Sequence, residues 1–133
     1  MRSKAREIVF KYLFAELFNP SDEGLFAVLL NDEQLKEEDK VFAKDLLSYC
    51  EKEKEIYIEE ISALSTSFNL TRIHAADKCS IIVGMAELDN YPDTPKIVII
   101  DEAIKLSAKY STEKSTDFVN GILAEYARRK RND

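Results

Sequence analysis

The fold of this 133-residue chain is decided by the stretch PKIVIIDEAIKLSAKYSTEKSTDFVNGIL, residues 95–123, whose pattern predicts two helices joined by a short polar turn. Thr94 is expected to cap the first helix, with Pro95 in its first turn, where a missing N–H leaves no hydrogen bond unmade. Apolar residues then recur every three or four positions on two faces, which predicts a central, buried helix. These faces hold Ile97, Ile100, Ile104 and Ala108, and Ile99, Ala103, Leu106 and Tyr110, and the charged wedge between them holds Asp101, Glu102, Lys105 and Lys109.

The second helix of this stretch begins near Ser115, where a serine or a neighbouring residue can cap it. Its apolar face holds Val119, Ile122, Leu123 and Tyr126, and Phe118 lies at the rim of that face. The stretch therefore predicts two helices packed into one core.

Composition extends the helical prediction to the whole chain. The hydrophobic content is 45%, and only three Gly and three Pro interrupt 133 residues, which favours long helices in a single domain, residues 1–133. Four further helical segments are expected: residues 3–18, a short one within 21–31, a long acidic one over 40–64, and one over 71–88 capped by Thr71. In the long acidic helix Glu53 interrupts the apolar stripe, so a bend or a partly uncovered face is expected there.

The net charge of −6 is unevenly placed. From Ser21 to Glu60 there are 13 Asp or Glu against 5 Lys, so the two ends of the chain are basic relative to the middle. A nucleic acid would therefore have to meet a local patch or come with a basic partner. The segment 128–133 begins with four cations and is expected to be a mobile basic tail.

A second apolar stripe on the first helix consists of Phe10, Phe14 and Phe18, four residues apart. Such a stripe is usually covered by a neighbouring helix, and the other interpretation is a face that docks a protein partner. Both interpretations stay open from the sequence.

No catalytic or metal-binding motif stands out. His74 is the single histidine, and Asp101 and Glu102 are adjacent on a helix, so their carboxylates diverge instead of acting on one atom. We expect no enzyme, no metal and no cofactor. Cys50 and Cys79 are expected to be buried thiols, and the absence of an apolar run long enough to cross a membrane predicts a cytoplasmic protein.

The opening stretch resembles the NusB family of bacterial transcription antitermination factors. The resemblance is carried by Pro95, Val98, Ile100-Asp101-Glu102-Ala103, Ser115 and Phe118-Val119-Asn120-Gly121, and is supported by Asp77-Lys78, Glu87-Leu88 and Ala5-Arg6-Glu7. Two positions depart from the family pattern: Ile82 stands where an arginine is common, and Asp101 where an asparagine is usual.

The resemblance implies a compact all-α bundle of two small helical subdomains and no catalysis. It implies an RNA-binding factor that pairs with the ribosomal protein NusE, recognises boxA RNA in nascent ribosomal RNA transcripts, and so acts on the transcription elongation complex. Carried over by position, the RNA-binding residues are Arg2, Lys4, Arg6, Lys114 and Phe118, and the NusE-binding residues are Phe14 and Asp77.

An alternative function is a helical protein-interaction or dimerisation module without RNA binding, which would use the phenylalanine stripe, and a homodimer is left open by the sequence. A third interpretation, a NusB-like domain of the kind fused to ribosomal RNA methyltransferases, is disfavoured because 133 residues hold no cofactor-binding domain besides the helical one.

Overall fold

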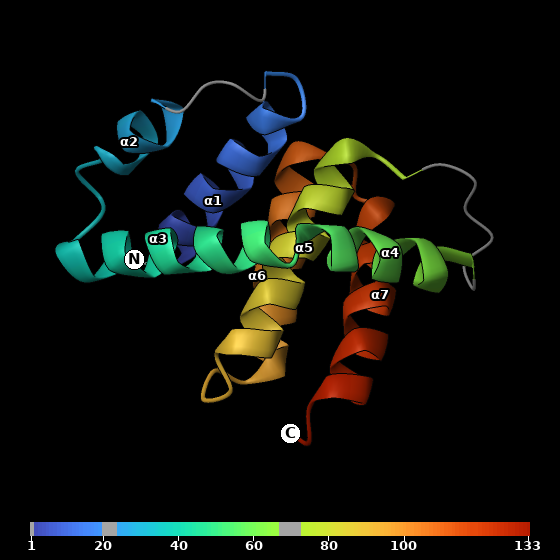
Figure 1. Ribbon diagram of the computed structural model, residues 1–133. Helices are drawn as coiled ribbons and strands as arrows, with labels where there is room; N and C mark the ends of the chain where they lie inside the picture. Colours follow the sequence, from blue (N-terminus) through green and yellow to red (C-terminus); the bar gives the residue numbers. More distant parts are fainter. Residues whose placement is uncertain (1, 20–23, 67–72) are drawn as a thin grey trace.

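A computed structural model describes residues 2–19, 24–66 and 73–133 of the chain, and all regular structure in these ranges is helical (Figure 1). The predicted all-α class is therefore confirmed. The helices are α1 (Arg2–Glu16), α2 (Leu25–Leu30), α3 (Glu37–Lys52), α4 (Lys54–Ser65), α5 (Ala75–Asn90), α6 (Lys96–Tyr110) and α7 (Ser115–Lys130). The predicted cap Thr71 lies outside the described residues.

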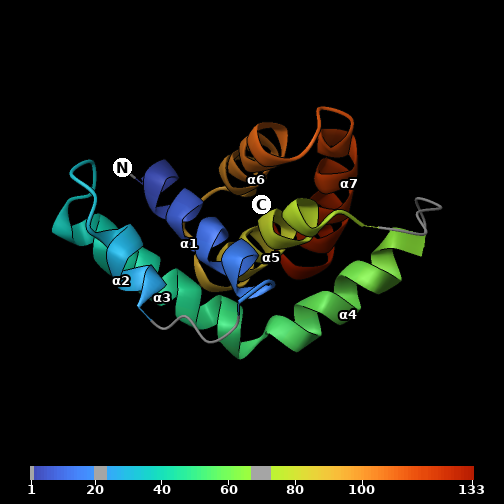
Figure 2. The same cartoon turned by 90° about the horizontal axis from the view of Figure 1, so that it is seen from above.

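The central helix of the bundle is α5. Twelve of its sixteen residues are buried, and it contacts α1, α3, α4, α6 and α7. Figure 2 shows α5 in the middle, with α3 and α4 along one side and α6 and α7 on the other. At Gly84 the neighbouring helix α7 comes so close that an added Cβ would lie 2.8 Å from Cδ1 of Leu123. A side chain at position 84 would require the Leu123 side chain to shift.

Two groups of helices meet at α5. Helices α1, α2 and α3 pack on one another, and α4, α6 and α7 pack with α5 in the second group. The two subdomains share one continuous core, because α1 and α3 also contact α5.

The long acidic segment forms two helices instead of one. The break falls at Glu53, the residue that interrupts the apolar stripe, where the sequence predicted a bend or a partly uncovered face within one helix. On α4, Tyr57 is buried and its hydroxyl donates to Oδ2 of Asp89 at 2.9 Å, and the Tyr126 hydroxyl of α7 donates to the same oxygen at 2.7 Å. These bonds hold α4 and α7 against the end of α5.

The prediction that the helix after Pro95 is buried on both apolar faces is confirmed for the middle of each face and wrong for the ends of one of them, since Ile100 is buried and Ile104 is partly buried against the core. Ile99, Ala103 and Leu106 are buried, but Ile97 is 74% exposed and Ala108 is exposed as well. Figure 2 shows the reason, because α6 lies at the edge of the bundle and has neighbours on its inner side only. The apolar face on α7 is confirmed, with Val119, Ile122, Leu123 and Tyr126 all buried.

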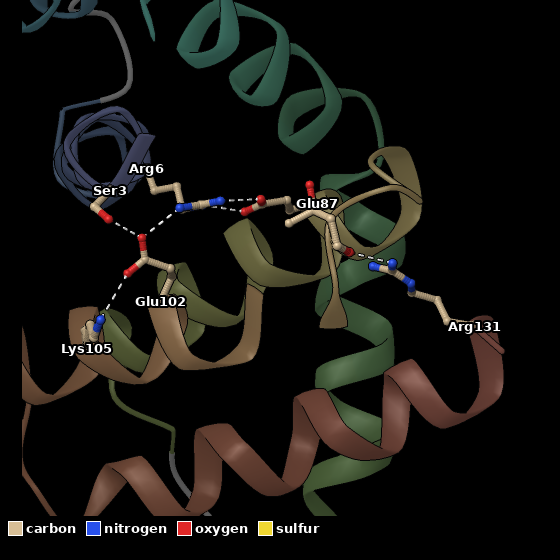
Figure 3. Close-up of polar contacts among 7 residues, drawn as sticks. Ser3, Arg6, Glu87, Glu102, Lys105 and Arg131 are labelled. Carbon is tan, nitrogen blue, oxygen red and sulfur yellow. Dashed lines mark hydrogen bonds and ion pairs between the residues drawn. The ribbon is translucent and has the colours of Figure 1, made fainter. Parts of the chain in front are cut away.

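The loop between α5 and α6 is held by the end of the chain. Thr94 was the expected cap of α6, but Pro95 holds the position before its first residue, and the backbone N–H of Lys96 donates instead to Oδ2 of Asp133 at 2.9 Å. Nη2 of Arg131 donates to the carbonyl oxygens of Pro92 and Thr94, at 2.9 and 2.6 Å. The segment predicted as a mobile tail thus completes α7 and then lies against this loop (Figure 3).

A buried ion network joins α1, α5 and α6 (Figure 3). Arg6 donates from Nε and Nη2 to the two carboxylate oxygens of Glu87, both at 2.7 Å, and from Nη1 to Oε1 of Glu102 at 2.7 Å. Ser3 donates to the same Glu102 oxygen. Because the charges are removed from water, their desolvation is offset only while every partner stays in place.

We expect Glu87→Ala to lower the free energy of unfolding by about 3–5 kcal/mol, because it leaves the Arg6 guanidinium buried with one carboxylate in place of two. Urea unfolding followed by circular dichroism measures this. The control is Glu55→Ala on the exposed side of α4, expected to stay within about 0.5 kcal/mol of wild type. Equal unfolding midpoints for the two variants would show that the network does not stabilise the fold.

Candidate functional site

A cavity of about 340 Å³ lies between the first turns of α1 and the outer side of α6. Its lining includes the charged residues Lys4, Arg6, Glu7, Glu102, Lys105 and Lys109. We call it the α1–α6 cavity. It brings together a predicted RNA-binding residue, Lys4, and two lysines of the charged wedge, Lys105 and Lys109, to which the sequence assigned no function.

The lysines stand at the mouth of this cavity, and the carboxylates lie deeper. The side chains of Lys105 and Lys109 are well exposed, whereas those of Glu7 and Glu102 are largely buried. Lys4 lies 3.4 Å from a Glu7 oxygen and 3.6 Å from an Asp32 oxygen. Nζ of Lys109 lies 2.6 Å from Glu7 and Nζ of Lys105 lies 3.7 Å from Glu102, so the lysines that neutralise these carboxylates are the same ones whose side chains are exposed at the mouth.

Glu7 is the most strongly perturbed acid of the cavity. Burial opposes its ionisation, but Nζ of Lys109 and the hydroxyl of Tyr110, each donating at 2.6 Å, outweigh burial and lower the pKa of Glu7 to about 2. Glu7 is consequently a fixed negative charge at neutral pH, and it holds the last turn of α6 against α1.

The predicted RNA ligand Arg6 is 5% exposed, and Nε, Nη1 and Nη2 all donate to carboxylates. A guanidinium in this position supports the fold and is not presented to a phosphate. Arg2 differs, because its side chain is on the exposed start of α1, where its guanidinium lies 4.5 Å from the ring centre of Phe42. The sequence could not separate these two arginines, because their partners are distant in the chain.

A second cavity, of about 330 Å³, lies where α5 and α7 begin, and we call it the α5–α7 cavity. It contains three predicted site residues, Lys114, Phe118 and Asp77, with Ile73, His74, Thr112 and Ser115 as their neighbours. Lys114 is exposed, but Phe118 is only 9% exposed and forms part of the wall. Asp77 is buried and accepts a hydrogen bond from the Ser107 hydroxyl at 2.6 Å.

The phenylalanine stripe of α1 runs from the core to the surface. Phe10 is buried against Tyr110, with ring centres 4.9 Å apart, and Phe14 lies between Phe10 and Phe18 at 6.1 and 5.2 Å. Phe18 is 70% exposed, and Leu17 beside it is exposed too. The start of the stripe is covered, as in the first interpretation. Its end is an exposed apolar surface, for which docking of a protein partner stays a prediction.

The described residues hold no group of three or more His, Cys, Asp or Glu side chains placed to bind a metal ion. Cys50 and Cys79 are buried free thiols, as predicted, and burial raises the pKa of Cys79 to about 12, which keeps this thiol protonated at neutral pH. Among the helices described, none is long and apolar enough to cross a membrane.

Known proteins with similar sequences belong to one family. The NusB family model matches residues 3–128 of the chain. The transcription antitermination protein NusB of Methylacidiphilum infernorum is 34% identical over 125 residues, which covers 92% of this chain and 87% of that protein. The protein of the same description from Agathobacter rectalis is 34% identical over 134 residues, covering 95% of this chain and 98% of that protein.

Solved structures share the fold. T. maritima NusB superposes with a TM-score of 0.88 at 28% identity, over 99% of this chain and 94% of that one. A crystal structure of the antitermination factors NusB and NusE in complex with dsRNA gives a TM-score of 0.82 at 22% identity, over 96% of each chain, a level of identity that speaks for the fold alone.

The pKa of Glu7 predicts how stability depends on pH. The pKa of Glu7 in the folded state lies below the usual value of 4.5. The contribution of the ionised Glu7 to folding stability is therefore complete above pH 4.5 and is lost as the pH falls toward 2. Glu7→Gln should therefore be less stable than wild type at neutral pH, and the difference should shrink between about pH 5 and about pH 3. Urea unfolding across this range measures it, with Glu59→Gln on exposed α4 as the control. A constant difference at all pH values would contradict the assignment.

Proposed function

The chain belongs to the NusB family of transcription antitermination proteins, and from this premise we propose that it binds boxA-type nascent RNA of ribosomal RNA operons together with the ribosomal protein NusE. The observation that carries the proposal is a row of lysines, Lys4, Lys105, Lys109 and Lys114, along the start of α1, the outer side of α6 and the loop after it. Such a row attracts the phosphates of RNA whatever the nucleotide sequence.

The distribution of the other charges supports the same path. The acidic residues between Ser21 and Glu60 belong largely to α3 and α4, which lie across α5 from α6 and α7 (Figure 2). A polyanion is repelled from that side and approaches the lysine row on the other side. The exposed Arg2 is included in the proposed surface, and the buried Arg6 is left out as a direct ligand.

Bases are expected to contact the α5–α7 cavity. Single-stranded RNA is recognised through unstacked bases that meet aromatic side chains and polar groups. Phe118 supplies an aromatic wall and Lys114 a charge at its edge. Since Phe118 is mostly covered, we propose contact with a base that enters the cavity instead of stacking on an open ring.

The partner surface is proposed at the end of α1. The solved structure with this fold that contains NusB and NusE with dsRNA suggests such a partner for this chain too. Phe14 and the exposed Phe18 offer an apolar patch of the kind that anchors protein interfaces. Asp77, the second predicted partner residue, is covered and bound to Ser107, so we propose that it shapes the α5–α7 cavity next to the partner.

Lys114→Glu is expected to weaken binding of a boxA-type RNA, measured with NusE present, by about tenfold at low salt, since it replaces attraction by repulsion of a phosphate. The slope of log affinity against log salt should fall by about 0.7, the amount for one lost contact to a single strand. Lys44→Glu on α3 is the matched control, with the same charge change on an exposed helix and no expected loss. If NusE leaves the RNA affinity of the wild type unchanged, the proposed pairing is wrong.

Phe14→Asp and Phe18→Asp separate this function from a self-associating module without RNA binding. We expect neither variant to bind NusE in analytical ultracentrifugation, because docking would remove the introduced charge from water. Without NusE, each variant should sediment as the same species as wild type. A wild-type dimer that becomes a monomer in both variants, with no RNA binding, would instead favour the dimerisation module. Phe18→Asp is the cleaner test, because this side chain is exposed and its loss leaves the core intact.

A further inference from the structure

The lining of the α1–α6 cavity combines charged, apolar and amide side chains, which can contact different parts of one ligand. At about 340 Å³ it lies at the small end of the range of ligand sites, which is roughly 300–1,000 Å³. It therefore suits one nucleotide or a ligand of similar size.

The mouth of the cavity attracts anions. Lys105 and Lys109 have exposed ammonium groups on successive turns of α6, and Lys4 reaches the same space from α1. The ion pair of Lys105 with Asp101 at 3.4 Å lies on the exposed surface, where ion pairs contribute little, so its ammonium can turn toward a phosphate at low cost.

Beside the lysines, the cavity lining consists of groups that are neutral or already paired. Leu106 supplies an apolar wall, and Ser3 and Glu102 a polar edge. Gln34, from the loop between α2 and α3, adds an amide with both donors and an acceptor, and its own backbone N–H is fixed by Oδ1 of Asp32 at 2.8 Å. A glutamine amide matches the donor and acceptor pair on the edge of a base, and RNA bases offer such edges when they leave the stack.

We propose that the α1–α6 cavity binds a single unstacked nucleotide, with its phosphate on Lys105 and on Lys109, whose ammonium also donates to Glu7 at 2.6 Å, its base against Leu106 and its base edge on Gln34. This inference rests on the proposed RNA binding and assigns the nucleotide to the bound RNA. The same chemistry would accept a free nucleotide, and the experiment distinguishes the two sources.

The test uses a set of boxA-type RNAs in which one nucleotide at a time is made abasic. The affinity of each RNA is measured with NusE present for four proteins: wild type, Gln34→Ala, Lys105→Gln and the control Lys44→Gln. In wild type, one abasic position should reduce affinity by about tenfold, as for loss of a bound base. With Gln34→Ala the intact RNA should bind more weakly, and the penalty at that same position should largely disappear, while penalties at other positions persist. Lys105→Gln should weaken every RNA to a similar degree, and Lys44→Gln should match wild type.

Three outcomes overturn the inference in distinguishable ways. If wild type binds RNA but no abasic position couples to Gln34, the cavity holds no nucleotide of that RNA, and the proposed function stands without it. If AMP alone binds with dependence on Gln34 and Lys105 while the RNA titrations are unaffected by these variants, the ligand is a free nucleotide. If wild type binds no RNA with NusE present, the proposed function fails and the inference fails with it. All variants replace exposed side chains, so circular dichroism should show unchanged folding.

Discussion

The contact on which the rest of this structure depends is the buried pairing of Arg6 with Glu87 and Glu102. Three hydrogen bonds of 2.7 Å join the first, fifth and sixth helices at a point where Arg6 and Glu87 are buried and Glu102 is largely buried. An apolar contact could slide along a helix, but a guanidinium with fixed donor directions matches its carboxylates in only one register. The network therefore sets how α1 lies on α5 and α6. It also forms the floor of the α1–α6 cavity, so that fold and candidate site share the same residues.

The charged side chains differ between the floor and the mouth of the α1–α6 cavity, and between the two sides of the helical bundle. Carboxylates near the cavity floor are each held by a cation, as Glu7 is by Lys109, whereas the ammonium groups at the mouth remain exposed. Across the bundle, α3 and α4 carry most of the acidic excess. An overall negative protein can bind a polyanion by this arrangement, because at physiological salt the attraction is felt over roughly 8 Å and depends on the local surface, not on net charge. A basic partner at the end of α1 would extend the favourable surface.

Particular elements show where prediction from sequence succeeded. The face of Val119, Ile122, Leu123 and Tyr126 on α7 follows from local spacing and is observed. The interrupted apolar stripe at Glu53 also follows from spacing, but the single helix predicted around it is two helices in the structure. The face of α6 that holds Ile97, Ile100, Ile104 and Ala108 is covered only at its two middle residues, because spacing identifies an apolar face without saying how much of it a neighbour covers. Of the two positions that depart from the family pattern, Asp101 has its side chain on the surface beside Lys105, while Ile82 is buried in the core.

By itself the sequence determined the helical class, most helix boundaries, the family pattern and the acidic middle of the chain, since each depends on residues close together along the chain. Only the tertiary structure decided which cations are free. Arg2 and Arg6 are equivalent in local pattern, but Arg6 meets carboxylates 81 and 96 residues away and is buried by them. The α1–α6 cavity has the same origin, because it exists only where α1, the loop with Gln34 and α6 meet. Burial and pairing of a charged side chain are set by distant neighbours, and local spacing carries no information about them.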